Sequence, residues 1–143
     1  MSASKERLYF LIQRAAHVLK ARADAALKES AGLSTAQGAV LTILISDGPC
    51  TQRRLADRLM QRESAITTMA ERLLKAGYVT RERSPSDARA WVLEATGEGR
   101  AAHAAMRAPF DEINAMLDSV FDENDAERFA AGLRAIIDRP DDD

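Results

Sequence analysis

The spacing of apolar residues in the middle of the chain constrains its fold more than any other feature. Five of them fall at positions i, i+3, i+4, i+7 and i+8, which places them on one face of an α-helix. They are Ile66, Met69, Ala70, Leu73 and Leu74. The opposite face begins with short hydrogen-bonding side chains and ends with long cationic ones, an order that suits a helix in the major groove of DNA. The residues of this outer face are Ser64, Ala65, Thr68, Glu71, Arg72 and Lys75, with Thr67 on its flank.

The segment before this helix predicts a shorter helix that is joined to it by a tight turn. Thr51 is a suitable N-cap, and the apolar residues of 51–59 share one face while Arg53 and Arg54 lie on the other. Only residues 60–61 separate the two helices, so together they form a helix-turn-helix. Each helix alone has the pattern of an ordinary surface helix; the short connection favours the DNA-binding arrangement.

The segment after the helix predicts a β-hairpin. Gly77 suits the left-handed residue that ends a helix. Residues 78–83 and 89–94 have the composition of strands, and residues 84–88 that of the turn between them. Helix, turn, helix and hairpin in this order make a winged helix. The predicted fold class is therefore mainly α with a small β-hairpin wing, a winged helix-turn-helix flanked by further helices.

This stretch resembles the DNA-binding core of MarR-family transcription regulators over about fifty of the 143 residues. The most specific match is the pair Asp87-x-Arg89 in the wing. The resemblance implies that Arg89 enters the minor groove of DNA and that Asp87 orients it. It also implies that Ser64, Thr67 and Thr68 face the major groove. The matching residues are Thr51, Gln52, Leu55, Ala56, Arg58, Leu59, Ser64, Thr67, Arg72, Leu73, Gly77, Val79, Arg81, Arg83, Asp87, Arg89, Leu93, Thr96, Gly99 and Arg100.

The chain departs from the family in the turn and in the recognition helix. The family usually has Gly and then an Asp helix cap where this chain has Met60 and Arg62, so we expect Arg62 to contact phosphate instead. An Arg often stands at the position of Thr68, which suggests a different operator sequence. The expected DNA-binding residues are Arg53, Arg54, Arg62, Ser64, Ala65, Thr67, Thr68, Arg72, Arg83, Asp87 and Arg89.

The distribution of charge supports nucleic-acid binding although the net charge of −2 does not. Residues 51–91 hold nine cationic and five acidic side chains, a surplus of four positive charges. Residues 92–143 hold five and thirteen, a surplus of eight negative charges. A basic middle with an acidic end is typical of a DNA-binding protein whose other half stays away from phosphates.

The winged helix is predicted to lie between helical segments of a single domain, residues 1–143. We place the DNA-binding core at residues 34–95, dimerisation helices at residues 1–30 and 97–138, and an acidic tail at residues 139–143. Apolar residues in the last helical segment step by four and three, the spacing of helices that pair. We expect a homodimer that sets two recognition helices about one turn apart on a pseudo-palindromic operator; the alternative is that these helices fold on their own subunit. The expected interface residues are Leu8, Leu11, Phe110, Ile113, Leu117, Phe129, Leu133 and Ile136.

Local signals predict where the flanking helices begin and bend. Ser34 and Gln37 have the spacing of a capping box. Thr96 is expected to cap one long helix that Pro109 kinks, because a proline inside a helix removes a hydrogen bond. Asn124 begins a second capping pattern.

No pattern in the chain predicts catalysis, a cofactor or a metal. Residues 97–102 match the dinucleotide-binding motif G-x-G-x-x-A, but the hairpin before them and the helices after them leave no second parallel strand. Cys50 is the only cysteine; a helix start nearby would favour its thiolate, and a plain, partly buried thiol is the simpler interpretation. No Cys or His has metal-ligand spacing. We therefore expect a protein that is not an enzyme.

His17 and Arg14 form a polar site in an otherwise apolar helix. The resemblance implies a small aromatic or anionic effector, and these two residues are candidates for its pocket; a surface or interface histidine is the alternative. The longest apolar runs are far shorter than the ~20 residues of a membrane span, and no signal peptide is visible, so a cytoplasmic protein is expected.

Together these patterns predict a sequence-specific DNA-binding transcriptional regulator, a repressor whose DNA affinity a small effector controls. The alternative is a winged-helix module that binds an acidic protein partner without specific DNA binding.

Overall fold

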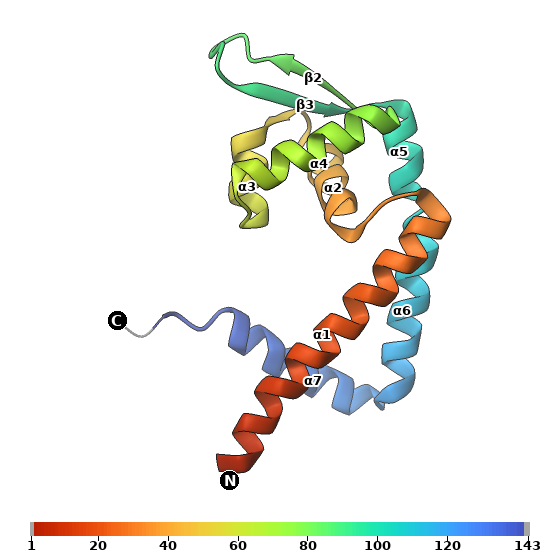
Figure 1. Cartoon of the computed structure of the whole chain (residues 1–143). Helices are drawn as coiled ribbons and strands as arrows, with labels where there is room; N and C mark the ends of the chain where they lie inside the picture. The colour runs from red at the N-terminus through yellow and green to blue at the C-terminus, as the bar shows by residue number, and fades with distance from the viewer. Residues whose placement is uncertain (1, 142–143) are drawn as a thin grey trace. The chain divides into compact units, whose positions relative to one another are not determined.

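The chain forms two compact units, Met1–Pro109 and Phe110–Asp143. The structure, a computed structural model, describes the backbone of residues 2–141 and the side chains of residues 7–141. The predicted acidic tail therefore lies partly outside the described residues. The elements are, in order, α1 (Ser2–Ala31), α2 (Thr35–Asp47), β1 (Cys50–Thr51), α3 (Gln52–Leu59), α4 (Glu63–Ala76), β2 (Val79–Arg83), β3 (Trp91–Ala95), α5 (Gly97–Ala104), α6 (Arg107–Val120) and α7 (Glu123–Ile137) (Figure 1).

Two side chains fix the corner between α1 and α2. The predicted capping box is confirmed: the Ser34 hydroxyl accepts a hydrogen bond from the Gln37 backbone N–H, and the Gln37 side chain accepts one from the Ser34 N–H. In addition, the Asp24 carboxylate in α1 accepts a bond of 2.7 Å from the Thr35 N–H. The first turn of α2 thus receives acceptors from two segments, which satisfies N–H groups that a helix leaves unpaired.

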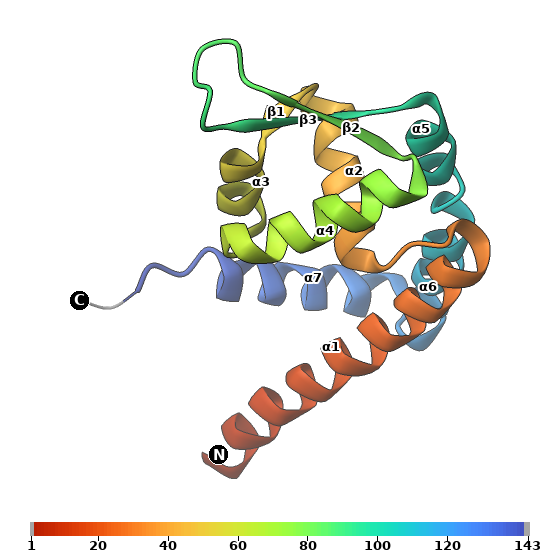
Figure 2. The same ribbon diagram turned by 45° about the horizontal axis from the view of Figure 1, so that its top comes forward.

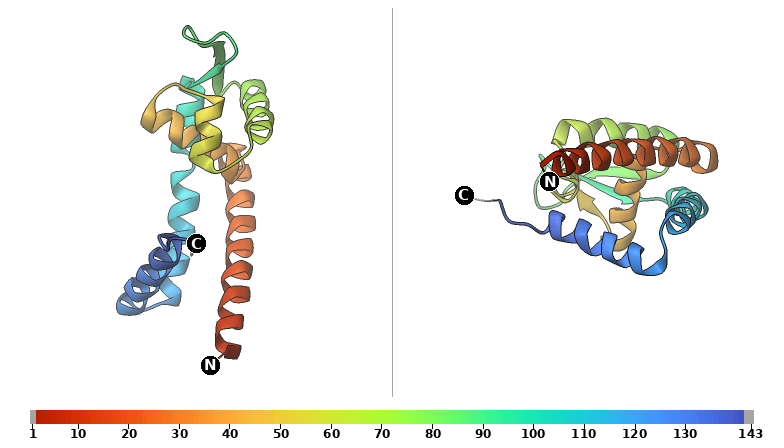
Figure 3. Two further views of the ribbon diagram at one scale, coloured as in Figure 1. Left: turned by 90° about the vertical axis from the view of Figure 1, so that its left-hand side faces the viewer. Right: turned by 90° about the horizontal axis from the view of Figure 1, so that it is seen from below.

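The sheet has three antiparallel strands in the order β1-β3-β2. The predicted hairpin is confirmed, with Arg83 opposite Trp91 and Val79 opposite Ala95. The two-residue strand β1 was not predicted, because the signals around Cys50 indicated only a break before the next helix. Helices α2 and α3 pack against β3, while the tip of the hairpin extends beyond the helices (Figures 2 and 3).

The core of the first unit lies where α2, α3 and α4 meet the sheet and the end of α1. The predicted inner face of α4 is confirmed, since Ile66, Ala70 and Leu73 are buried. Aliphatic side chains from the helices α1–α5 and the strands β2 and β3 fill this core, so burial of apolar area is its main stabilising term. The largest fully buried side chains are Leu27, Val40, Leu41, Leu44, Leu55, Ile66, Leu73 and Leu93.

The prediction of one long, kinked helix after the wing was wrong. The structure has two helices there, α5 and α6, separated by a turn at residues 105–106. Pro109 lies in the first turn of α6 instead of inside a helix, a position where the missing N–H costs no hydrogen bond. Met106 turns into the core at the break and lies against Gly38, so it does not belong to an apolar pairing face.

The second unit contains most of α6 and the helix α7. The N-cap of α7 is Asp122, whose carboxylate accepts a hydrogen bond from the Asp125 N–H at 2.8 Å. The sequence pattern had suggested Asn124 instead. Phe121 and Phe129 stack with ring centroids 5.0 Å apart. In the described part of the chain, no helix is long and apolar enough to cross a membrane.

Candidate nucleic-acid interface

The recognition helix α4 presents a polar face that the rest of its unit leaves uncovered. Ser64, Thr68 and Arg72 are exposed, and Ala65 and Thr67 are half-buried. Arg62 occupies the N-cap position and makes no side-chain capping bond, as its replacement of the usual Asp predicted. Gly77 ends the helix with a left-handed φ of 80°. The helix is therefore positioned by its apolar face, and its opening turns remain accessible.

The hydroxyl groups on this face differ in what they can still offer a ligand. Thr67 donates to the Glu63 carbonyl at 3.0 Å, and Thr68 donates to the Ser64 carbonyl at 3.2 Å. A hydroxyl has one hydrogen, so these two side chains retain only acceptor capacity and a methyl group. Within the described residues, the Ser64 side chain makes no hydrogen bond. Ser64 is therefore the free hydroxyl donor among the three predicted major-groove residues.

Sequence reasoning gave no role to Gln52, which connects the two helices of the motif. Its side chain is 7% exposed, and its Nε2 donates to Thr67 Oγ1 at 3.1 Å. Its Oε1 is buried without a hydrogen-bond partner. The available signal was position: Gln52 lies on the same face as Leu55, Ala56 and Leu59. A polar residue on an apolar helix face predicts a partner on the neighbouring helix.

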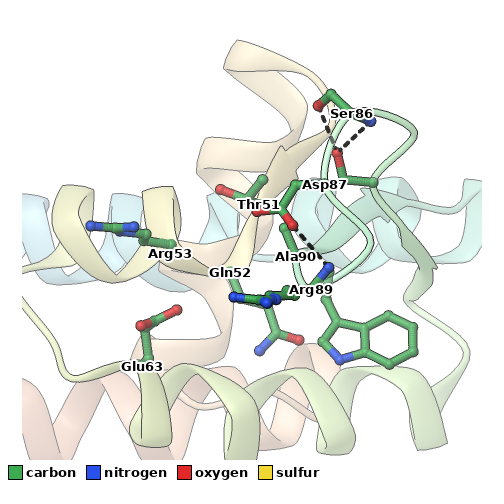
Figure 4. A pocket seen from close by; sticks show the side chains of 10 residues that line it. Thr51, Gln52, Arg53, Glu63, Ser86, Asp87, Arg89 and Ala90 are labelled. Carbon is green, nitrogen blue, oxygen red and sulfur yellow. Dashed lines mark hydrogen bonds between the residues drawn. The ribbon is translucent and has the colours of Figure 1, made fainter.

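The tip of the wing is a hydrogen-bonded turn centred on Asp87. The Asp87 carboxylate accepts from the backbone N–H of Arg89 at 3.0 Å, and the Asp87 carbonyl accepts from Ala90 N–H at 3.0 Å. Asp87 thus orients the Arg89 backbone, and among the described residues the Arg89 guanidinium has no hydrogen-bond or ion-pair partner. The Arg89 side chain extends back over a pocket toward Gln52 (Figure 4).

This pocket, of about 520 Å³, lies between α3, the start of α4 and the wing. Two predicted phosphate or groove contacts, Arg53 and Arg89, line it, as do Glu63 and Asp87. The pocket shows that the helix and the wing border one surface with space between them. Its lining residues are Thr51, Gln52, Arg53, Glu63, Ser84, Ser86, Asp87, Arg89, Ala90 and Trp91.

The remaining predicted cations and the interface candidates do not line this pocket. Arg54, Arg62 and Arg72 are exposed around the helix-turn-helix and do not line the pocket. Arg14 and His17 are exposed on α1 and do not line it either. The expected interface residues are exposed or half-buried within their own units: Leu8 55%, Leu11 56%, Phe110 37%, Phe129 47% and Ile136 62% exposed, with Ile113, Leu117 and Leu133 half-buried.

The other chemical motifs are structural. Cys50 is buried in the core, and burial raises the pKa of its thiol, so the thiol form is favoured over the nucleophilic thiolate. Residues 97–102 begin α5 after an antiparallel hairpin, which is not the βαβ unit of a dinucleotide site. Among the described residues, no group of His, Cys, Asp or Glu could hold a metal ion.

Comparison with known proteins agrees with this geometry. Residues 33–91 match the model of the MarR family, so the resemblance seen in the sequence is confirmed. No curated protein sequence matches the chain.

Three solved structures show the fold. The transcriptional regulator BldR from Sulfolobus solfataricus is 24% identical with a TM-score of 0.80, covering 96% of each chain. The S. aureus MepR–DNA complex is 24% identical with a TM-score of 0.80, covering 90% of this chain and 95% of that chain. The PcaV regulator from Streptomyces coelicolor with its natural ligand is 23% identical with a TM-score of 0.77, covering 90% of this chain and 89% of that chain.

Proposed function

Because residues 33–91 carry the winged helix of the MarR family, we propose that this chain binds duplex DNA sequence-specifically and regulates transcription. The observation that carries the proposal is that the start of α3, the start of α4 and the tip of the wing border one pocket. A recognition helix and a wing on one side of a protein can meet adjacent grooves of the same duplex. The MepR–DNA complex, which has the same fold, supports this use of the surface.

In this proposal the side chains divide between reading bases and binding phosphates. Ser64 donates to a base edge, while Ala65, Thr67 and Thr68 offer methyl groups and acceptors. Arg89 enters the minor groove from a wing turn that Asp87 shapes. Guanidinium groups that the structure leaves exposed are suited to bidentate phosphate contacts. The proposed phosphate contacts are Arg53, Arg54, Arg62, Arg72 and Arg83.

A homodimer would bring two such surfaces to one operator. Large apolar side chains are exposed in each unit of the single chain, among them Leu11 at 56% and Ile136 at 62%. Exposed apolar side chains on helices are typical of surfaces that a partner covers. Two-fold symmetry would then match the two half-sites of a pseudo-palindromic operator.

The finer proposal is a repressor that releases DNA when a small aromatic or anionic effector binds. It is supported by the fold shared with PcaV, which was solved with its natural ligand. Arg14 and His17 are the side chains proposed to meet that effector. An effector needs to favour only one of two arrangements to change DNA affinity. Titration of the DNA complex with aromatic acids, repeated with Arg14→Ala, tests it; no release by any acid contradicts it.

The proposed function is tested by selecting bound duplexes from a random pool and then titrating the selected sequence. Specific binding at about 10⁻⁸–10⁻¹¹ M near physiological salt is expected. Arg89→Ala should weaken binding and reduce the log–log salt slope by about 0.9. Arg128→Ala, an exposed arginine on α7, is the matched control and should change neither. Absence of any selected sequence would favour a module that binds an acidic protein instead.

A further inference from the structure

The only tryptophan of the chain lies in the wing and contacts two arginines. The Arg83 guanidinium carbon is 3.8 Å from the Trp91 ring centroid, and that of Arg81 is 4.6 Å from it. Both distances are well inside the ~6 Å within which a cation is attracted to an aromatic face. Trp91 is half-buried, lines the pocket beside α3, and was not among the residues expected from the sequence.

The register of the hairpin produces this cluster. Arg81 and Arg83 are two residues apart in β2, so their side chains lie on the same face of the sheet. Trp91 is directly opposite Arg83 in β3, and Arg81 is its diagonal neighbour on that face. Cross-strand and diagonal pairs are both within reach of long and aromatic side chains. One indole therefore meets two guanidinium groups without any special backbone geometry.

Arg83 has a second contact that fixes its position. Its Nη1 donates to the Ala88 carbonyl at 3.0 Å, across the tip of the wing. A guanidinium has five N–H donors, and attraction to a ring uses the charge and not the donors. The Arg83 head is therefore ordered by a ring and a carbonyl while most of its donors remain available for an anion.

We propose that Trp91 is a positioning residue for DNA binding, whose indole holds Arg81 and Arg83 ready for the phosphate backbone. The inference rests on the proposed function and adds a residue and a mechanism to it. Ordering a long side chain during binding costs free energy and so lowers affinity. The indole orders two such side chains before DNA binds. Trp91 itself need not touch DNA. Its contribution to affinity then passes entirely through the two arginines.

The experiment measures binding of the full chain to its selected duplex by Trp91→Leu and Trp91→Phe variants. Loss of two cation–ring contacts predicts that Trp91→Leu binds roughly 5- to 30-fold more weakly. Trp91→Phe keeps an aromatic face and should lie within about threefold of the wild type. Thermal melting of each variant checks the fold. Trp91→Thr, which suits a strand equally well, replaces the leucine variant if that variant does not fold.

A double-mutant cycle separates positioning from a merely structural role. In an Arg81→Ala, Arg83→Ala background, Trp91→Leu should have almost no further effect on affinity, whereas in an Arg54→Ala background its effect should be unchanged. Arg54 is the matched control because it is an exposed arginine that is also proposed to contact phosphate, on α3 instead of the wing.

Two results would overturn the inference. One is an equal loss for Trp91→Leu in the presence and absence of the two wing arginines. The other is wild-type affinity of Trp91→Leu. Both leave the proposed function intact, whereas a wild-type chain that selects no duplex contradicts the proposed function itself.

Discussion

At the scale of single residues, the side chains of α4 differ in their free hydrogen-bonding capacity. Thr67 donates to Glu63 and accepts from Gln52, so its hydroxyl belongs to the helix pair. Ser64 is exposed and has no such bond among the described residues. Three residues that the sequence pattern treated alike therefore have different roles in the proposed contact with DNA.

Ser64→Ala should relax discrimination at one base pair by about 1–3 kcal/mol and leave folding almost unchanged. Thr67→Val should leave base discrimination almost unchanged and lower the free energy of unfolding by about 1 kcal/mol, because it removes two internal hydrogen bonds. Binding to single-base variants of the selected duplex, together with urea unfolding, measures both effects. Equal specificity profiles for the two variants would contradict this assignment of roles.

The Asp24 carboxylate predicts an acid-sensitive corner between α1 and α2. The hydrogen bond from the Thr35 N–H, with that residue's hydroxyl and Lys20 as smaller causes, lowers the pKa of Asp24 below its ordinary value of 3.8. A carboxyl group whose pKa is lower in the folded than in the unfolded chain stabilises the fold at pH values above its unfolded-state pKa. This stabilisation is lost as the pH falls through its folded-state pKa. Asp24→Asn should therefore cost about 1 kcal/mol at pH 7, and the cost should shrink below pH 3.8. Urea unfolding across pH measures it; a cost independent of pH contradicts it.

Residue roles were predictable where they follow from spacing and unpredictable where they depend on a partner. Thr51 as a helix cap and Gly77 as a left-handed residue follow from local geometry, and both are confirmed. The hydrogen bond between Gln52 and Thr67 joins residues fifteen apart. The Trp91 cluster likewise depends on the hairpin register, which composition alone does not fix.

At the scale of elements, the start of α5 is packed directly on the backbone of Tyr78, which follows the recognition helix. A Cβ at Gly99 would overlap the Tyr78 carbonyl oxygen and lie within 3.2 Å of its Cα. Backbone cannot retreat as a flexible side chain does, so only glycine fits there. Of the two glycines that suggested a dinucleotide motif, Gly99 therefore serves close packing.

Gly99→Ala should cost roughly 1–3 kcal/mol of unfolding free energy, the range for overpacking a filled site. Gly97→Ala, in the first turn of the same helix and with nothing within 4 Å of its Cβ, is the matched control. It should be neutral or stabilising by up to about 1 kcal/mol, because alanine loses less backbone entropy. Chemical unfolding compares the two variants. Equal stabilities would show that the Tyr78 backbone shifts to accommodate the added methyl group.

The periodic helices and the hairpin were predictable, whereas the two-residue strand β1 and the break between α5 and α6 were not. The apolar faces of α2 and α4 repeat often enough to identify a helix. β1 has two residues and exists only because β3 supplies its partner. The break between α5 and α6 occurs where Met106 turns into the core, a tertiary contact that overrides an uninterrupted helical pattern.

At the scale of the whole molecule, basic and acidic residues are separated along the chain. The basic surplus falls in residues 51–91 and the acidic surplus in residues 92–143. The sequence sufficed to predict this layout and the winged helix. The operator and the dimer interface are properties of more than one molecule, because they depend on how two copies are spaced on DNA, so residue patterns in one chain do not specify them.

Leu11→Asp should weaken self-association at least tenfold without unfolding the chain, since Leu11 is 56% exposed within the single chain. A charge at a buried interface position costs several kcal/mol in the dimer and little in the monomer. Gln13→Asp, an exposed position two residues away on α1, adds the same charge as a control. Sedimentation velocity over a concentration series measures association. A Leu11→Asp dimer as tight as the wild type would remove α1 from the interface.

The hydroxyl of Thr96 connects two helices of the first unit, α4 and α5. It donates to the Gly77 carbonyl at the end of α4, 2.7 Å away, and accepts from the Gly99 N–H in α5, 3.0 Å away. Beside it, Gly99 leaves α5 no slack against Tyr78. A rotation of α5 must therefore either break these hydrogen bonds or move the recognition helix with it. The two helices are therefore expected to move as one body. Thr96→Val removes both hydrogen bonds and should let α4 and α5 move independently.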